Sequence, residues 1–111
     1  STKELRQVNH IYHLATIEDW DLSCSLGIYT RSKPGLDITD VGFIHACYRS
    51  QLPIIYKKCF CDLEYSLCLQ IDVNSLNVPV RVERNNVGEY FPNVYGPIAI
   101  SSISCVESYE T

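Results

Sequence analysis

The feature that most constrains the fold is the order of short strand-type segments around only two helix signals. Helix signals occur at 17–26 and at about 50–60. With so few helices between so many strands, we expect the helices to pack on a mainly antiparallel sheet. The sequence therefore predicts an α+β fold. Strand-type runs bounded by turn residues are expected at 11–15, 28–30, 43–48, 65–72, 79–83 and 98–106.

Capping residues set the limits of the two predicted helices. Thr16 offers a side-chain oxygen to the first helix, and Gly27 is placed to end it in a left-handed conformation. Ser50 can cap the second helix, whose first turn tolerates Pro53 because no N–H is needed there. The segment 91–97 is punctuated by Phe-Pro and Gly-Pro steps, so we expect an irregular loop.

Length and charge limit the class of protein. A chain of 111 residues has room for one hydrophobic core, so 1–111 is predicted to be a single domain. No apolar run approaches the roughly 20 residues that a membrane span needs. The net charge is −4, and no basic stripe is present. We therefore expect no membrane and no nucleic acid as main partner, and the oligomeric state stays open.

Six cysteines in a short chain leave two interpretations open. An even number is typical of a disulfide framework in a small secreted domain. However, the charged segment 1–7 has no apolar h-region, and most of the cysteines lie among apolar residues, where a free thiol acts as a small hydrophobe. We favour reduced thiols, no secretory signal and a cytoplasmic location.

Polar groups in three apolar stretches predict a pocket. The stretches 11–16, 42–47 and 91–97 place an imidazole, amide or phenol where a structural segment usually carries Val, Leu or Thr. His13 and His45 would open onto one hollow if their strands lie side by side. Alone, each histidine is more often structural, so the prediction depends on their occurring together with a carboxylate and an aromatic loop.

Metal and cysteine chemistry are less favoured by the spacing. His10 and His13 are three residues apart, so in a strand they point to opposite faces. His45 and Cys47 share a face, but no third ligand is signalled, and we expect no metal. A Cys47 nucleophile could not use His45 as its base across about 6.5 Å of strand, although His13 remains possible.

At these residues the chain resembles a family of small bacterial and plant proteins known as domain of unknown function 952. The family pattern combines Ile-Tyr-His/Lys, a helical Trp, Gly-Phe-Ile-His, a Glu and Phe-Pro-His-Leu-Tyr-Gly-Pro, and the resemblance covers about 10–107. The matching residues are Ile11 to Ala15, Trp20, Gly42 to His45, Val82-Glu83 and Phe91-Pro92, followed by Val94 to Ile98.

The resemblance implies a fold similar to the ADP-ribosyltransferase and RNA 2′-phosphotransferase group, in which a split antiparallel sheet holds NAD. By this resemblance His13 would contact the nicotinamide ribose, and His45 would occupy the second-strand position of the site. Glu83 resembles the late-strand carboxylate that would stabilise an oxocarbenium-like centre. These three residues are the catalytic candidates that the resemblance implies.

Further residues of the matched motifs are expected to bind the ligand. Tyr95 would stack on the base. Asn93 stands where the family usually has His, which removes a titratable group but keeps a donor and an acceptor. Cys47 stands near the position where the family tends to place Ser. The expected ligand-binding residues are Tyr12, Thr16, Phe43, Asn93, Tyr95 and Gly96.

Three functions remain as predictions. The first is a domain whose His and aromatic cleft binds a nucleotide-like small molecule of the NAD or ADP-ribose type. An enzyme that uses NAD for ADP-ribosyl or phosphoryl transfer is the alternative, and a protein-interaction scaffold without a ligand is the second alternative. Binding is preferred because a catalytic NAD site would normally show a clearer set of charged groups.

Overall fold

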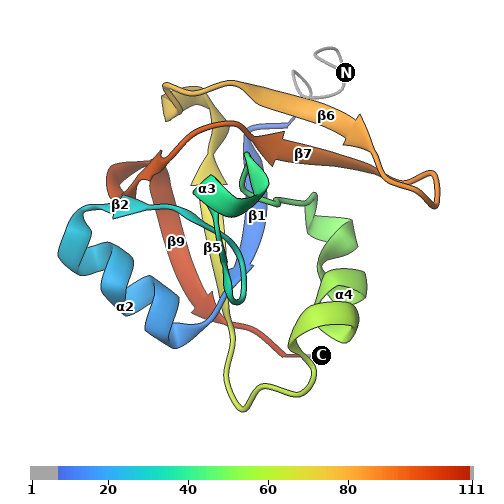
Figure 1. The fold of residues 1–111 in the computed structure, drawn as a ribbon, viewed down its shortest axis with the longest axis horizontal. Helices are drawn as coiled ribbons and strands as arrows, with labels where there is room; N and C mark the ends of the chain where they lie inside the picture. The colour runs from blue at the N-terminus through green and yellow to red at the C-terminus, as the bar shows by residue number, and fades with distance from the viewer. Residues whose placement is uncertain (1–7, 111) are drawn as a thin grey trace.

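A three-stranded antiparallel sheet runs through the centre of the molecule. The computed structural model describes residues 8–110. Strand β5 (Leu67–Asp72) lies between β1 (His10–Ala15) and β9 (Ile103–Ser108) (Figure 1). In the first pair His13 lies opposite Leu69. Alternate residues of β5, such as Leu69 and Ile71, are buried, as strand periodicity requires.

Three small antiparallel sheets surround this centre. They pair β2 (Ile28–Tyr29) with β8 (Ile98–Ala99), and β3 (Arg31–Lys33) with β4 (Leu36–Asp37). The third is a hairpin of β6 (Val80–Arg84) and β7 (Tyr90–Val94), which crosses above one end of the central sheet (Figure 1). Antiparallel sheets with few helices confirm the predicted α+β class.

Helix α2 (Ile17–Leu26) forms where it was predicted. Thr16 Oγ1 accepts a hydrogen bond from the Asp19 amide at 3.1 Å, which satisfies an amide that has no partner within the helix. Gly27 ends the helix with a φ of 77°, a conformation that favours glycine. A four-residue helix, α3 (Ile38–Val41), was not predicted, and its capping residue is Asp37.

The second predicted helix is a composite of three helix types. A 3-10 turn at Arg49–Gln51 leads into α4 (Leu52–Ile55), which continues as a π-helical turn over Tyr56–Phe60. Pro53 lies in the first turn of α4, as predicted. Further 3-10 turns lie at Val73–Ser75 and Ile100–Ser102.

The segment 43–48 is not the continuous strand that was predicted. Ile44 pairs with Val94 of β7, whereas Cys47 pairs with Tyr12 of β1, and only these isolated bridges form. The segment crosses from the hairpin to the central sheet, so no single neighbour can pair with its whole length. His45 lies in this crossing, between the two bridges.

The segment 91–97 is also more regular than the irregular loop that was predicted. Residues 90–94 form β7, in which Pro92 lies opposite Val82. Strand β7 has a partner along its whole length on one side only, where a strand tolerates the missing N–H of proline. Backbone pairing therefore outweighs the Pro signal here.

Two adjoining clusters form the core. The larger is centred on Ile11, Ile44, Ile71 and Val94, all of which are fully buried. The smaller joins Tyr12, Leu14 and Cys47 of the sheet region to Leu52 and Phe60 of the composite helix. This second cluster fixes the helix against β1 and supports one side of the pocket described below.

The six cysteines are all free thiols. Only Cys47 is buried, and Cys24, Cys59 and Cys61 are exposed, so the expectation that the thiols pack as core residues holds for a minority. Across residues 8–110, none of the helices has the length and apolar character needed to cross a membrane.

Candidate functional site

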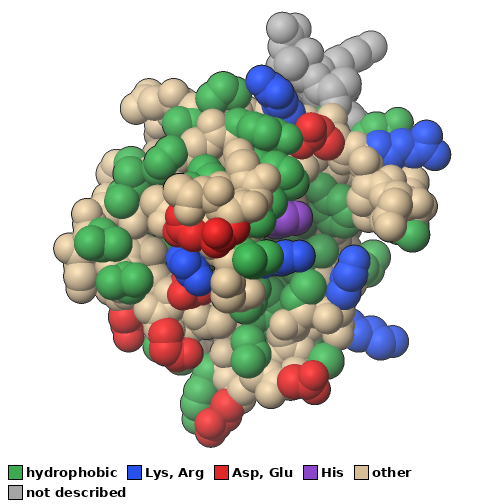
Figure 2. Space-filling model, viewed as in Figure 1, with side chains coloured by type: hydrophobic (Ala, Val, Ile, Leu, Met, Phe, Trp, Pro, Cys, Tyr) green, Lys and Arg blue, Asp and Glu red, His purple; other side chains and the backbone are tan. Residues whose placement is uncertain are grey.

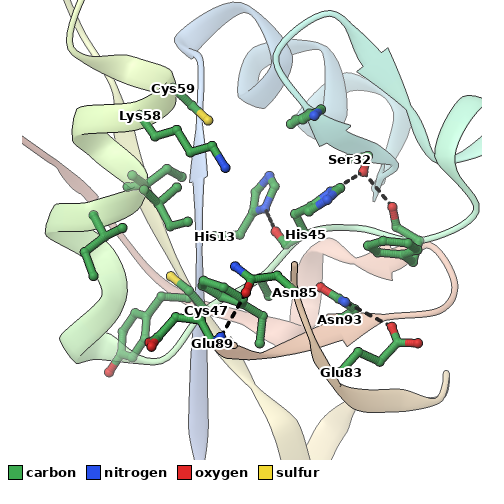
Figure 3. A pocket seen from close by; sticks show the side chains of 18 of the residues that line it. His13, Ser32, His45, Cys47, Lys58, Cys59, Glu83, Asn85, Glu89 and Asn93 are labelled. Carbon is green, nitrogen blue, oxygen red and sulfur yellow. Dashed lines mark hydrogen bonds between the residues drawn. The ribbon is translucent and has the colours of Figure 1, made fainter. Parts of the chain in front are cut away.

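A pocket of about 580 Å³ lies between the central sheet, the composite helix and the β6–β7 hairpin. Its floor is apolar and includes Leu14, Ala46, Cys47, Phe60 and Phe91. The polar side chains around it come from segments far apart in the sequence, as Figure 3 shows. The polar lining residues include His13, Ser32, Lys33, His45, Lys58, Glu83, Arg84, Asn85, Asn86, Glu89 and Asn93.

His13 is buried and both of its ring nitrogens are engaged. Nδ1 lies 2.5 Å from the carbonyl oxygen of His45, and Nε2 lies 2.8 Å from the hydroxyl of Tyr29. Burial lowers the pKa of His13 to about 4, so the ring is neutral at pH 7. The Nδ1–H therefore donates to the carbonyl, and Nε2 accepts from Tyr29. His13 thus holds the backbone of His45 in place.

His45 is held in one tautomer by Ser32. The buried Ser32 hydroxyl lies 2.6 Å from the Phe43 carbonyl and 2.9 Å from His45 Nδ1. A serine hydroxyl has one proton, which it donates to the carbonyl, so its oxygen accepts from Nδ1–H of His45. In the neutral ring Nε2 then carries the lone pair. His13 and His45 are adjacent, as predicted, but the contact joins the His13 ring to the backbone carbonyl of His45.

Positive charge surrounds the His45 ring. Partial burial lowers the pKa of His45, and the nearby ammonium groups of Lys33 and Lys58 lower it further. Lys58 extends from the composite helix toward the two histidines (Figure 3). The space-filling view shows histidine surface in a hollow with basic side chains beside it (Figure 2).

Glu83 is held by two neighbours on the hairpin side of the pocket. Tyr95 donates to its Oε1 at 2.5 Å, and Asn93 Nδ2 donates to the same oxygen at 3.0 Å. These bonds lower the pKa of Glu83, so it is ionised at neutral pH. Asn93 is buried, and among the residues described here its Oδ1 has no hydrogen-bond partner.

Aromatic rings connect the His45 side of the pocket to the Glu83 side. The Phe43 ring lies 4.7 Å from the His45 ring and 5.1 Å from the Tyr95 ring, measured between centroids. The guanidinium of Arg81 lies 4.7 Å from the centroid of Tyr95 and forms a cation–π contact. The predicted residues Phe43, His45, Glu83, Asn93 and Tyr95 are therefore brought together in one wall.

Tyr12 and Cys47 also line the pocket, on the side of β1. The Tyr12 hydroxyl accepts a hydrogen bond from Arg49 at 3.4 Å. Burial raises the pKa of Cys47 to about 12, so its thiol stays protonated at neutral pH. With both nitrogens of His13 engaged elsewhere, the geometry gives Cys47 no base, and cysteine nucleophilic chemistry is not supported.

Thr16 and Gly96 are the predicted site residues that lie outside the pocket lining. Thr16 Oγ1 is used as the cap of α2. Gly96 packs closely against Val78, and a Cβ built on it would lie 2.4 Å from Val78 Cγ1. Both residues therefore have structural roles, Thr16 in helix capping and Gly96 in close packing.

Sequence reasoning missed Ser32, Lys33 and Lys58. Ser32 lies in a segment that reads as a plain Pro-Gly loop, and nothing local indicates that it is fully buried. A signal for Lys58 does exist, because Ile54, Ile55, Lys58 and Cys59 recur at helical spacing and all line the pocket. In residues 8–110 there is no cluster of His, Cys, Asp or Glu side chains that could hold a metal ion.

The fold and pocket define a small α+β protein with a solvent-reachable hollow between a central sheet and a hairpin. The chain belongs to the family described as protein of unknown function (DUF952), whose pattern matches residues 14–106. This confirms the family resemblance found in the sequence. No curated protein matches the chain significantly.

Solved structures of one bacterial protein have a similar fold. The crystal structure of protein CC0527 from Caulobacter crescentus is 24% identical, with a TM-score of 0.79 over 91% of this chain and 86% of that chain. Its solution NMR structure is 23% identical, with a TM-score of 0.71 over 90% of this chain and 84% of that chain. At this identity the similarity concerns the fold.

Proposed function

We propose that the pocket binds a nucleotide-like small molecule of the NAD or ADP-ribose type. The observation that carries the proposal is the hollow of about 580 Å³ with an apolar floor and several fixed polar groups. Its volume lies in the range of about 300–1,000 Å³ that is usual for ligand pockets. Apolar walls exclude water, and the polar groups orient the ligand.

The base and the ribose of such a ligand each have a matching part of the wall. The tilted rings of Phe43 and Tyr95 offer a face for a planar base. The ionised Glu83 can accept hydrogen bonds from ribose hydroxyls through the carboxylate oxygen that Tyr95 and Asn93 leave free. The side chains that hold Glu83 in place are themselves half-buried or buried, so little reorganisation is needed on binding.

An NAD-using ribosyltransferase is the second candidate, and Glu83 is the observation that favours it. An ionised carboxylate held by two hydrogen bonds can stabilise a cationic ribose centre. This candidate also includes an ADP-ribosyltransferase-like fold. It gives His13 a positioning role, because its two nitrogens are already engaged. Incubation with NAD would release nicotinamide in wild type and not in Glu83→Gln.

A thermal-shift titration tests the binding proposal. NAD and ADP-ribose should raise the melting temperature of wild type in a saturable way, because a ligand that binds only the folded state stabilises it. Tyr95→Ala should weaken this effect. Tyr65→Ala is the matched control, since Tyr65 is 64% exposed and lies outside the pocket lining.

The outcomes of the titration separate the candidates. Stabilisation without release of nicotinamide supports binding, and release supports the enzyme. If neither compound shifts the wild type at millimolar concentration, both candidates are wrong and a protein-interaction scaffold becomes the better account. We also propose a cytoplasmic location, which the six free thiols support.

A further inference from the structure

In the part of the chain that the structure describes, two lysines at the His45 end of the pocket have no acidic partner. Lys33 comes from β3 and Lys58 from the π-helical turn, and both line the pocket. Within residues 8–110 neither ammonium group has a carboxylate at ion-pair distance. Arg31, on the same strand as Lys33, lies 3.3 Å from Asp19 and 3.6 Å from Asp37. This end of the pocket therefore carries positive charge that no described carboxylate neutralises through an ion pair, although the whole chain is acidic.

The backbone that carries Lys58 is unusual. Residues 56–60 form a π-helical turn, a rare conformation that occurs frequently at functional sites. Lys58, Cys59 and Phe60 are consecutive in this turn and all line the pocket. Three neighbouring residues of this turn thus contribute to one wall, and the apolar Phe60 anchors that wall in the smaller core cluster.

The His45 ring can become positively charged when an anion binds beside it. Ser32 fixes the Nδ1 side of the ring, which leaves Nε2 for the pocket. An unprotonated Nε2 can only accept a hydrogen bond, whereas the imidazolium donates from both nitrogens. An anion between His45 and the lysines favours the imidazolium, so its binding adds a proton to the ring.

We infer that the Lys33, Lys58 and His45 end of the pocket is the subsite for the phosphate groups of the ligand, with His45 binding them as the imidazolium. The inference rests on the proposed nucleotide-binding function and names the part of the ligand that this end recognises. The Glu83 side of the pocket, which carries a negative charge, takes the part of the ligand that has no phosphate.

The charges around His45 set the direction of the pH dependence. His13 is neutral at pH 7, and the basic side chains beside the His45 ring are those of Lys33 and Lys58. On the hairpin side, Glu83 is bound by Tyr95 and Asn93, and Glu89 accepts from Gln51 at 3.3 Å. Arg84 also lines the pocket. His45 gains a proton when an anion binds beside it, so the affinity for a phosphate of constant charge rises as pH falls.

Isothermal titration calorimetry with ADP and adenosine tests the inference, because the two probes differ only in the diphosphate. Wild type should bind ADP at least about tenfold more tightly than adenosine, which is the effect of one or two charge-assisted hydrogen bonds. Lys33→Gln with Lys58→Gln should reduce ADP affinity to near that of adenosine. Lys57→Gln is the matched control, since Lys57 is exposed and outside the pocket lining.

A second measurement reads His45 directly. ADP titrations in buffers of different ionisation enthalpy should show that wild type takes up more protons than His45→Gln near pH 7, because the titration of the terminal phosphate of ADP is common to both proteins. Equal affinity for ADP and adenosine in wild type, or an unchanged ADP affinity in the double lysine variant, overturns the phosphate subsite and leaves the binding proposal standing. If wild type binds neither probe and neither NAD nor ADP-ribose, the binding proposal itself is wrong, and the subsite with it.

Discussion

Replacing Ser32 with Ala tests the hydrogen-bond chain that orients His45. The hydroxyl is fully buried and makes two contacts, at 2.6 Å to the Phe43 carbonyl and at 2.9 Å to His45 Nδ1. The His45 ring is exposed enough to find water, so its lost bond should have a small effect. The Phe43 carbonyl loses a buried donor, which costs about 1–3 kcal/mol.

We therefore expect Ser32→Ala to lower the free energy of unfolding by about 2 kcal/mol, or the melting temperature by about 10 °C for a domain of this size. Urea denaturation measures the first quantity and calorimetry the second. Ser101→Ala is the matched control, because Ser101 is exposed and makes none of these contacts.

The same variant should also change the tautomer of His45. In wild type, nitrogen NMR of the histidine rings should show Nδ1 of His45 protonated and Nε2 unprotonated at pH 7.5. In Ser32→Ala this preference should be lost, while His13 keeps its protonated Nδ1. Unchanged stability together with an unchanged His45 tautomer would show that Ser32 neither supports the Phe43 carbonyl nor orients His45.

Two other predictions concern parts of the structure that support the site. Burial lowers the pKa of His13 to about 4 from 6.5. The unfolded chain therefore binds this proton first as pH falls, and stability should decrease by about 3 kcal/mol between roughly pH 7 and pH 4. Urea denaturation across this range should show a smaller decrease in His13→Asn, and parallel curves would contradict the assignment. Gly96→Ala should lower the free energy of unfolding by about 1–3 kcal/mol through overpacking against Val78. Val78→Ala should relieve part of this loss in the double variant, whereas strictly additive effects would show that the two residues do not clash.

The secondary structure was predictable wherever local chemistry decides it. Thr16 and Gly27 delimit α2 as their capping and left-handed roles require. The alternation of residue types over 65–72 identified β5, whose first residue is Leu67. By contrast, the segment 43–48 reads as a strand because of its composition, and only tertiary structure shows that it divides its pairing between β7 and β1. Strand β7 was missed for the opposite reason, since the Pro92 signal is local and the pairing with β6 is not.

The site was predictable from residue types but not in its internal geometry. Placing His13 and His45 together required only that polar residues in apolar segments mark a pocket. The sequence could not show that both ring nitrogens of His13 form hydrogen bonds, to His45 and Tyr29, because both partners are distant in the chain. Ser32, Lys33 and Lys58 were missed because single polar residues in loops and on helix surfaces are usually solvated.

The most direct test of the account is a titration of the protein, labelled with nitrogen-15 in its histidines, with ADP at pH 7. We expect the His45 ring resonances to move to those of an imidazolium and to saturate, while His10, which lies outside the pocket lining, stays unchanged. Saturating binding that leaves the His45 ring neutral, or the absence of any ADP-dependent change, would contradict it.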